Sequence, residues 1–170
     1  MDLRAEILKE HSRAQSEKIA KWVGSDPGRY AEVAELFLND EYRVCQRAAW
    51  VLSVVSEKHT DIATPHLPAM VKKISEPGVP VAVKRNVIRI LQFVEIPEDL
   101  HGDVMNICFE LLGDLRETIA VRVFSLTVLA RLAKTYPDIR QELRIIIEDE
   151  LSHQPSAAFK SRAKKLLADL

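Results

Sequence analysis

The sequence predicts an all-α protein in which helical hairpins repeat along the chain. A nine-residue pattern occurs four times, and in each copy apolar or small residues hold the first, fifth, eighth and ninth places. These places share one face of an α-helix. The copies cover residues 44–52, 83–91, 121–129 and 159–167. Their closing leucines are 39, 38 and 38 residues apart, and a constant period of this size marks a helical repeat array.

The composition agrees with one soluble domain over residues 1–170. The chain has 47% hydrophobic and 29% charged residues, 5 glycines and a net charge of −1, and it is long enough to bury a substantial core. We expect a cytoplasmic protein without a membrane span, because the sequence lacks both a secretory apolar run and a stretch of about 18 apolar residues. Cys45 and Cys108 are too few for a disulfide framework, and we expect both to be buried, unreactive thiols.

We expect residues 2–23 to form a single amphipathic leading helix, which Gly24 can end. Asp26 then caps a new helix that has Pro27 in its first turn, where the missing N–H of proline costs nothing. This helix, over residues 27–39, opens the first of four hairpins. The hairpins are expected over about 27–57, 60–95, 97–135 and 137–169, which with the leading helix gives about nine helices.

Proline placement supports these boundaries. Seven of the eight prolines fall at or close to a proposed helix boundary, and proline inside a helix would remove a hydrogen bond and clash with the preceding turn. Pro68 is the exception, and we expect it to kink the helix over about 62–75 or to delay its start. Glu98 and Asp99 open the helix over about 97–112, where the helix dipole favours carboxylates.

The hairpins resemble HEAT repeats, in which pairs of antiparallel helices stack side by side. In that family the second helix often begins with Asp, three residues, Val-Arg, two residues and then Ala. Asp40, Val44 and Ala48 fit this motif, whereas Cys45 stands at the basic place.

The third copy gives the best match to the HEAT motif. Val121 and Arg122 hold the Val-Arg places, with Glu117 at the acidic place and Ser125 at the small place. The resemblance covers about residues 27–170 and implies a short right-handed α–α superhelix, with the second helices along its concave side. It implies almost no chemistry, because the matching residues are packing residues.

The sequence holds no recognisable catalytic, cofactor-binding or metal-binding motif, so we expect no enzyme, no cofactor and no small-molecule substrate. Glu150 and His153 have the spacing of two ligands on a helix, but the spacing occurs once and is better explained as a surface pair. Two further clusters combine histidine with carboxylates. They are His59, Asp61 and His66, and Glu98, Asp99, His101 and Asp103. Turn formation and helix capping explain both clusters more simply than a metal or acid–base site.

Positive charge is concentrated in the second helices. Residues 41–57, 78–95, 115–134 and 156–170 carry 0, +2, +3 and +3. The rest of the chain is acidic, so the resemblance implies a basic concave face. The side chains expected to face outward there are Arg47, Trp50, Arg85, Arg89, Arg131 and Arg162. Arginine beside an exposed aromatic is common on surfaces that bind acidic peptides or nucleic acid.

The leading hypothesis is a non-enzymatic scaffold that binds a protein partner along this basic face, either an acidic segment or a second copy. The first alternative is a nucleic-acid-binding protein similar in fold to the HEAT-like DNA-alkylation-repair glycosylases. The pI of this chain is about 6.5, which counts against the nucleic-acid alternative, because dedicated nucleic-acid binders have a pI above about 9. The second alternative is an accessory domain of an enzyme complex.

The repeat assignment predicts that its closing leucines are core residues. Leu91→Ala or Leu129→Ala should each lower the free energy of unfolding by about 2–5 kcal/mol, through lost burial and a residual cavity. Chemical denaturation measures this loss. Curves that barely move for both variants would contradict the assignment.

Overall fold

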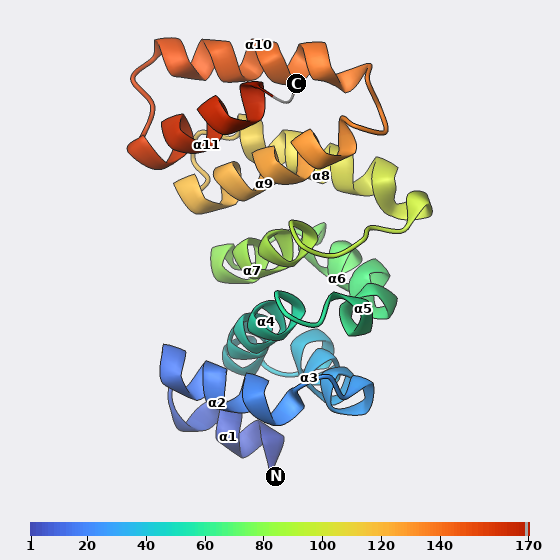
Figure 1. Cartoon of the computed structure of the whole chain (residues 1–170). Coiled ribbons are helices and arrows are strands. Elements are labelled where there is room, and N and C mark those ends of the chain that lie inside the picture. The colour runs from blue at the N-terminus through green and yellow to red at the C-terminus, as the bar shows by residue number, and fades with distance from the viewer. Residues whose placement is uncertain (169) are drawn as a thin grey trace. The chain divides into compact units, whose positions relative to one another are not determined.

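The computed structural model describes residues 1–168 and 170. Every regular element within these residues is helical, which confirms the predicted all-α fold (Figure 1). The chain divides into two compact units, unit 1 over Met1–Glu98 and unit 2 over Asp99–Leu170. The expected single domain over residues 1–170 stays a prediction.

The leading segment of unit 1 is two helices, so the expected single helix over 2–23 is wrong. Its helices are α1 (Leu3–Lys9) and α2 (Arg13–Val23). Glu10 between them is extended, and Ser12 caps α2 by accepting a hydrogen bond from the Gln15 N–H (3.1 Å). The Gln15 side chain donates to the Glu6 carbonyl of α1 (2.7 Å). The side chains of Ser12 and Gln15 therefore provide hydrogen bonds to backbone groups at the break between α1 and α2.

The first hairpin forms where the sequence predicts it. Its helices are α3 (Pro27–Asn39) and α4 (Tyr42–Ser56). The Asp26 carboxylate accepts hydrogen bonds from the N–H groups of Gly28 (2.9 Å) and Arg29 (3.1 Å), which confirms Asp26 as the cap of α3.

The first arm of the second hairpin is broken into short pieces. The hairpin comprises α5 (Thr60–Ala63), the 3₁₀ turn η1 (Thr64–His66), α6 (Leu67–Ile74) and α7 (Val81–Leu91). Pro65 lies in η1 and Pro68 lies in the first turn of α6, where proline is tolerated. Pro68 thus delays the start of α6, which is one of the two expected outcomes.

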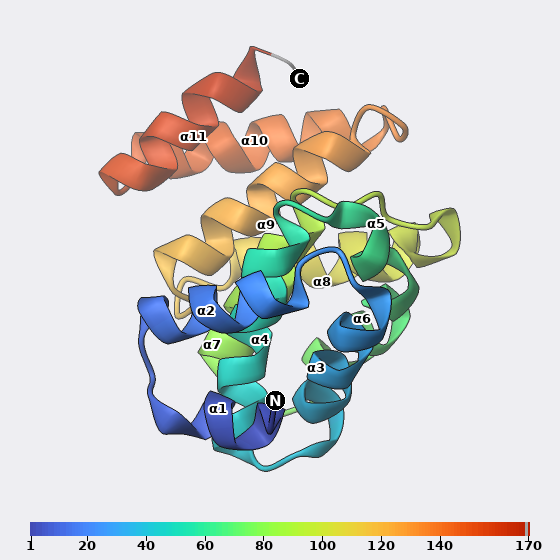
Figure 2. The same cartoon turned by 60° about the horizontal axis from the view of Figure 1, so that its bottom comes forward.

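Helix α4 is central to the packing of unit 1. It contacts its hairpin partner α3, the leading helices α1 and α2, and the second helix α7 of the next hairpin (Figures 1 and 2). The largest fully buried side chains of unit 1 are Ile7, Ile19, Tyr30, Phe37, Leu52, Leu67, Met70, Ile88, Ile90 and Leu91. The Tyr30 hydroxyl is satisfied in this core by the Ser56 hydroxyl (2.8 Å).

Unit 2 contains the last two hairpins. The elements from the 3₁₀ turn onward are η2 (Glu98–Leu100), α8 (His101–Gly113), α9 (Ile119–Leu132), α10 (Ile139–Ser152) and α11 (Ala157–Leu167). Helix α9 packs against α8, α10 and α11. Glu98 and Asp99 therefore stand in the 3₁₀ turn before α8 and not within its first turn. The predicted end of the last helix near Asp169 lies outside the described residues.

The repeated positions are buried as the pattern predicts, except at the end of the fourth copy, where Leu166 and Leu167 are both half-buried. The closing residues Leu52, Leu91 and Leu129 are at most 1% exposed, whereas Leu167 is half-buried. The residues at the first place are fully buried in all four copies; they are Val44, Val83, Val121 and Phe159. Each second helix thus supplies the core through the same places of its sequence.

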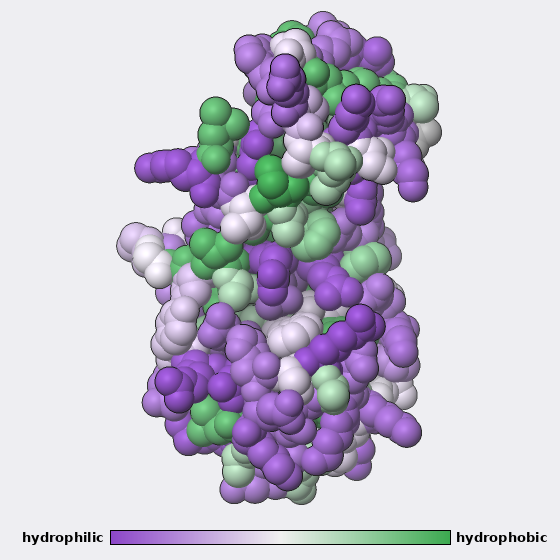
Figure 3. All heavy atoms as spheres, turned by 90° about the vertical axis from the view of Figure 1, so that its left-hand side faces the viewer, coloured by the Kyte–Doolittle hydropathy of each residue, from purple (hydrophilic) through white to green (hydrophobic). Residues whose placement is uncertain are grey.

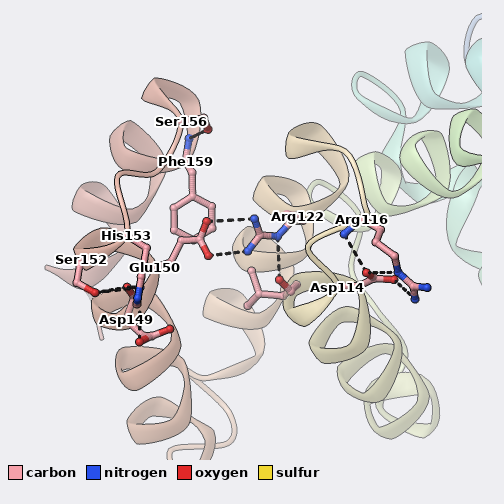
Figure 4. A network of polar contacts seen from close by, with 10 residues as sticks. Asp114, Arg116, Arg122, Asp149, Glu150, Ser152, His153, Ser156 and Phe159 are labelled. Atoms are coloured by element: carbon pink, nitrogen blue, oxygen red, sulfur yellow. Dashed lines mark hydrogen bonds and ion pairs between the residues drawn. The ribbon is translucent and has the colours of Figure 1, made fainter.

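An ion pair between a buried arginine and a half-buried glutamate joins the two hairpins of unit 2 (Figure 4). Arg122 of α9, 4% exposed, donates two hydrogen bonds to the Glu150 carboxylate of α10 (2.8 and 3.1 Å). It also donates to the Leu112 carbonyl at the end of α8 (3.0 Å), and its guanidinium lies 5.6 Å from the centre of the Phe159 ring. The hydrogen bonds from Arg122 hold the pKa of Glu150 below its usual value, although burial acts in the opposite direction. One side chain thus connects four helices.

We predict a large stability loss for Arg122→Ala and a negligible one for Arg116→Ala. Loss of Arg122 leaves the Glu150 carboxylate and the Leu112 carbonyl without their donor, which should cost about 2–4 kcal/mol. The control pair of Arg116 with Asp114 (2.9 Å) has its arginine side chain 92% exposed. Its loss should change the free energy of unfolding by less than about 0.5 kcal/mol. Urea denaturation followed by circular dichroism measures both; equal changes would contradict the role given to Arg122.

Acid should destabilise the fold through His66. This half-buried ring lies 5.2 Å from the Tyr30 ring, centre to centre, and burial lowers the pKa of His66 below its usual value. The unfolded chain therefore binds the His66 proton more readily than the folded protein does. The stabilising contribution is complete above about pH 6.5 and is lost as the pH falls through the lowered pKa.

The measurement is the melting temperature of the wild type and of His66→Gln at about pH 7.5 and about pH 5.5. Glutamine cannot titrate, so the variant should lose less stability on acidification than the wild type does. Equal losses in the two proteins would show that His66 plays no part in the acid sensitivity.

Candidate functional site

The predicted binding residues of unit 1 lie on α4 and α7, which pack side by side. Val81, Arg85 and Arg89 follow one another at intervals of four residues along one face of α7. Tyr42 and Trp50 of α4 hold the same repeat positions as Val81 and Arg89, because each pair differs by the 39-residue period. We refer to these five side chains as the α4–α7 surface.

The α4–α7 surface combines exposed apolar groups with arginine. Tyr42 is 63% exposed, Val81 is 43% exposed, and Arg85 is also exposed. Trp50 and Arg89 are half-buried, and Arg89 donates a hydrogen bond to the Glu57 carboxylate (2.8 Å). Tyrosine, tryptophan and arginine are the residue types that contribute most to protein interfaces.

Arg47, another predicted binding residue, is engaged with the leading segment. Its guanidinium donates to the carbonyls of Ile7 (3.1 Å) and Leu8 (2.9 Å) near the end of α1. Trp50 lies on the same helix and meets the His11 ring edge to face, with the ring centres 5.6 Å apart. The leading segment therefore covers this part of α4, where the sequence predicts a free surface.

The remaining predicted residues, Arg131 and Arg162, belong to unit 2. They lie on α9 and α11, which pack against each other, and both are half-buried. Arg162 donates a hydrogen bond to the Thr127 hydroxyl of α9 (2.8 Å). The predicted residues thus fall in both units, and their combination into one basic face stays a prediction.

Exposed apolar side chains at the start of the second helices form a set that the sequence analysis did not predict. Tyr42, Val81 and Ile119 are the first residues of α4, α7 and α9, and Ile119 is 39% exposed. Each stands two places before the nine-residue pattern, a register that could have identified them. Leu115, four residues before Ile119, is 76% exposed. Figure 3 shows apolar groups in green among purple hydrophilic side chains on one face of the molecule.

Several members of the polar clusters that the sequence contains have structural partners. Glu150 binds Arg122, while His153 hydrogen-bonds through Nδ1 to the Asp149 carbonyl (2.8 Å). His101 Nδ1 and the Tyr136 hydroxyl form a hydrogen bond (2.9 Å). Within residues 1–168 and 170, no group of three or more His, Cys, Asp or Glu side chains is placed to hold a metal ion.

Both cysteines are buried free thiols, as the sequence predicts. Burial raises the pKa of the Cys108 thiol to about 12 and also raises the pKa of Cys45. Since the thiolate is the nucleophile, neither group is poised for chemistry.

Among the helices of the described residues, none has the length and apolar character needed to cross a membrane. A family model described as a HEAT repeat domain matches residues 3–170. No curated protein and no solved structure matches the chain. HEAT repeats generally mediate protein–protein interactions and are typically scaffolds without enzymatic activity. Since the match spans nearly all of the sequence and agrees with the buried repeat positions, the chain belongs to the HEAT repeat family.

Proposed function

We propose that this protein is a non-enzymatic interaction module that binds a protein segment through the α4–α7 surface. The observation that carries the proposal is the exposure of Tyr42, Val81 and Arg85 on adjacent second helices. Tyr42 and Val81 offer apolar surface that unit 1 leaves exposed, and a partner can bury this surface. HEAT repeats supply such surfaces without catalytic machinery.

The chemistry of this surface favours a partner segment that combines apolar and acidic side chains. Arg85 offers an exposed guanidinium, which pairs with carboxylates in bidentate geometry. Tyr42 and Val81 offer contact area to aliphatic or aromatic groups. Helix α7, which holds Arg85, carries no carboxylate, so its own side chains do not repel an acidic partner.

The positive second helices also favour a second candidate, binding to nucleic acid. Phosphate contacts by arginine and lysine would dominate such binding and make it strongly dependent on salt. The net charge of −1 and the 6% aromatic content favour a protein partner instead.

Affinity capture from the native cell lysate tests the proposal with three immobilised baits. The wild type and the control Lys72→Glu should retain the same partner, because Lys72 is an exposed residue of α6 and lies outside the α4–α7 surface. Val81→Asp/Arg85→Glu should retain at least about tenfold less of it, because truncating central interface residues costs more than about 1 kcal/mol each. Equal capture by all three baits would contradict binding through the α4–α7 surface.

Fluorescence anisotropy with short labelled DNA and RNA at two salt concentrations distinguishes the second candidate. A protein-binding module should show no binding at low salt. Binding that weakens steeply with salt and disappears in Arg85→Glu/Arg89→Glu would instead establish the nucleic-acid function.

A further inference from the structure

Helix α1 is seated on α4 as a separate short ligand would be. Its seven residues bury two aliphatic side chains four positions apart, Leu3 (6% exposed) and Ile7 (1% exposed). α1 packs against both α4 and α2. Two anchors at this spacing are the way in which an amphipathic helix docks into a groove of a binding protein.

Hydrogen bonds hold both ends of α1 in place. Arg4 donates to the Asp40 carboxylate between α3 and α4 (2.8 and 3.0 Å). At the other end Arg47 of α4 donates to the carbonyls of Ile7 and Leu8, where the helix dipole favours a cation. Arg47 contacts only backbone oxygen in these two bonds, so it can hold the end of a helix of another sequence.

A further set of polar contacts joins α1 to α2. The Glu6 carboxylate accepts hydrogen bonds from Lys18 (2.7 Å) and Gln15 (2.9 Å) of α2. The bonds from Lys18 and Gln15 lower the pKa of Glu6 to about 2. The seat thus recognises an acidic residue in addition to the two aliphatic anchors.

The connection between α1 and α2 allows α1 to leave while α2 stays intact. Glu10 and Ser12 are extended, and His11 is exposed between them. Ser12 caps α2 with its own side chain, and this cap involves no residue of α1. The contacts that would be lost are those of α1 with its seat on α4 and those of Glu6 with Gln15 and Lys18 of α2.

We propose that the seat of α1 on α4 is a binding site for a short amphipathic helix of a partner protein, which displaces α1. This rests on the proposed function, because it adds a second contact of the partner on α4. The contacts of α1 define the chemistry of the partner helix. It carries two large aliphatic residues at positions i and i+4, a basic residue at i+1 and an acidic residue at i+3, as Leu3, Arg4, Glu6 and Ile7 do. Displacement of α1 also frees the connection that holds His11 against Trp50, so that more of Trp50 within the α4–α7 surface becomes available to the partner.

The test uses a fluorescein-labelled peptide of residues 1–12 as the probe and the full chain as the receptor. In the wild type the resident α1 competes with the peptide, whereas in Leu3→Ala/Ile7→Ala its anchors are missing. Fluorescence anisotropy should therefore show at least about tenfold tighter binding to the double variant, because the fraction of empty seats rises. Adding Arg47→Ala to the double variant should abolish this gain, and a peptide with Ile7→Asp should not bind.

Circular dichroism confirms that each receptor is folded. If Leu3→Ala/Ile7→Ala does not fold, Arg4→Glu replaces it, since this change repels Asp40 and leaves the apolar anchors in place; it too should bind the peptide more tightly than the wild type. A folded variant with released α1 that binds no better than the wild type overturns the proposal.

Light scattering tests whether a second copy of the chain, rather than a partner protein, fills the seat of α1. A wild-type dimer that becomes monomeric in Leu3→Ala/Ile7→Ala would mean that a second copy fills the seat, and this also overturns the proposal. The proposed function is tested separately, because Val81 and Arg85 lie on α7. Capture that depends on α7 together with failure of the peptide to bind would refute the helix seat alone.

Discussion

The structure depends on the burial of one face of every second helix between its own hairpin partner and a neighbouring second helix. A single hairpin leaves much of its apolar stripe in water, so the stripe is satisfied only when α4 packs on α7, or α9 on α11. This requirement fixes the first place of each copy, from Val44 to Phe159, as a buried residue. It leaves the outward places free to vary. The repeat therefore specifies the scaffold, and the residues outside the buried places carry whatever distinguishes this protein from other HEAT repeat proteins.

Those parts of the fold that depend on local chemistry could be predicted from the sequence. Asp26 followed by Pro27 begins a helix because the carboxylate and the proline ring act within one turn, and the structure agrees. The break at Ser12 could not be predicted in the same way, because residues 2–23 have a continuous amphipathic pattern. There the two helices separate because Leu3 and Ile7 dock on α4, a contact with a helix about 40 residues further along the chain.

The candidate site shows the same division between local and distant causes. Counting charges identified arginines on the second helices, but it could not separate an arginine that faces solvent from one that serves the fold. Arg122 is buried because Glu150, 28 residues later, and the carbonyl of Leu112 surround it. Arg47 is engaged because the end of α1 lies beside it. Arg85 has no comparable role in the scaffold, and it is the predicted residue that best fits a binding surface.

Exposed apolar residues carry more information about function than the arginines do, because the fold gives no reason for them. Charge on the outer side of a helix maintains solubility and needs no partner. Tyr42, Val81 and Ile119, in contrast, expose apolar surface at the same register in three successive copies, while their chemical type changes from aromatic to aliphatic. Under the proposed function this pattern has a physical reason, since contact with a partner demands apolar character at these positions without fixing the residue.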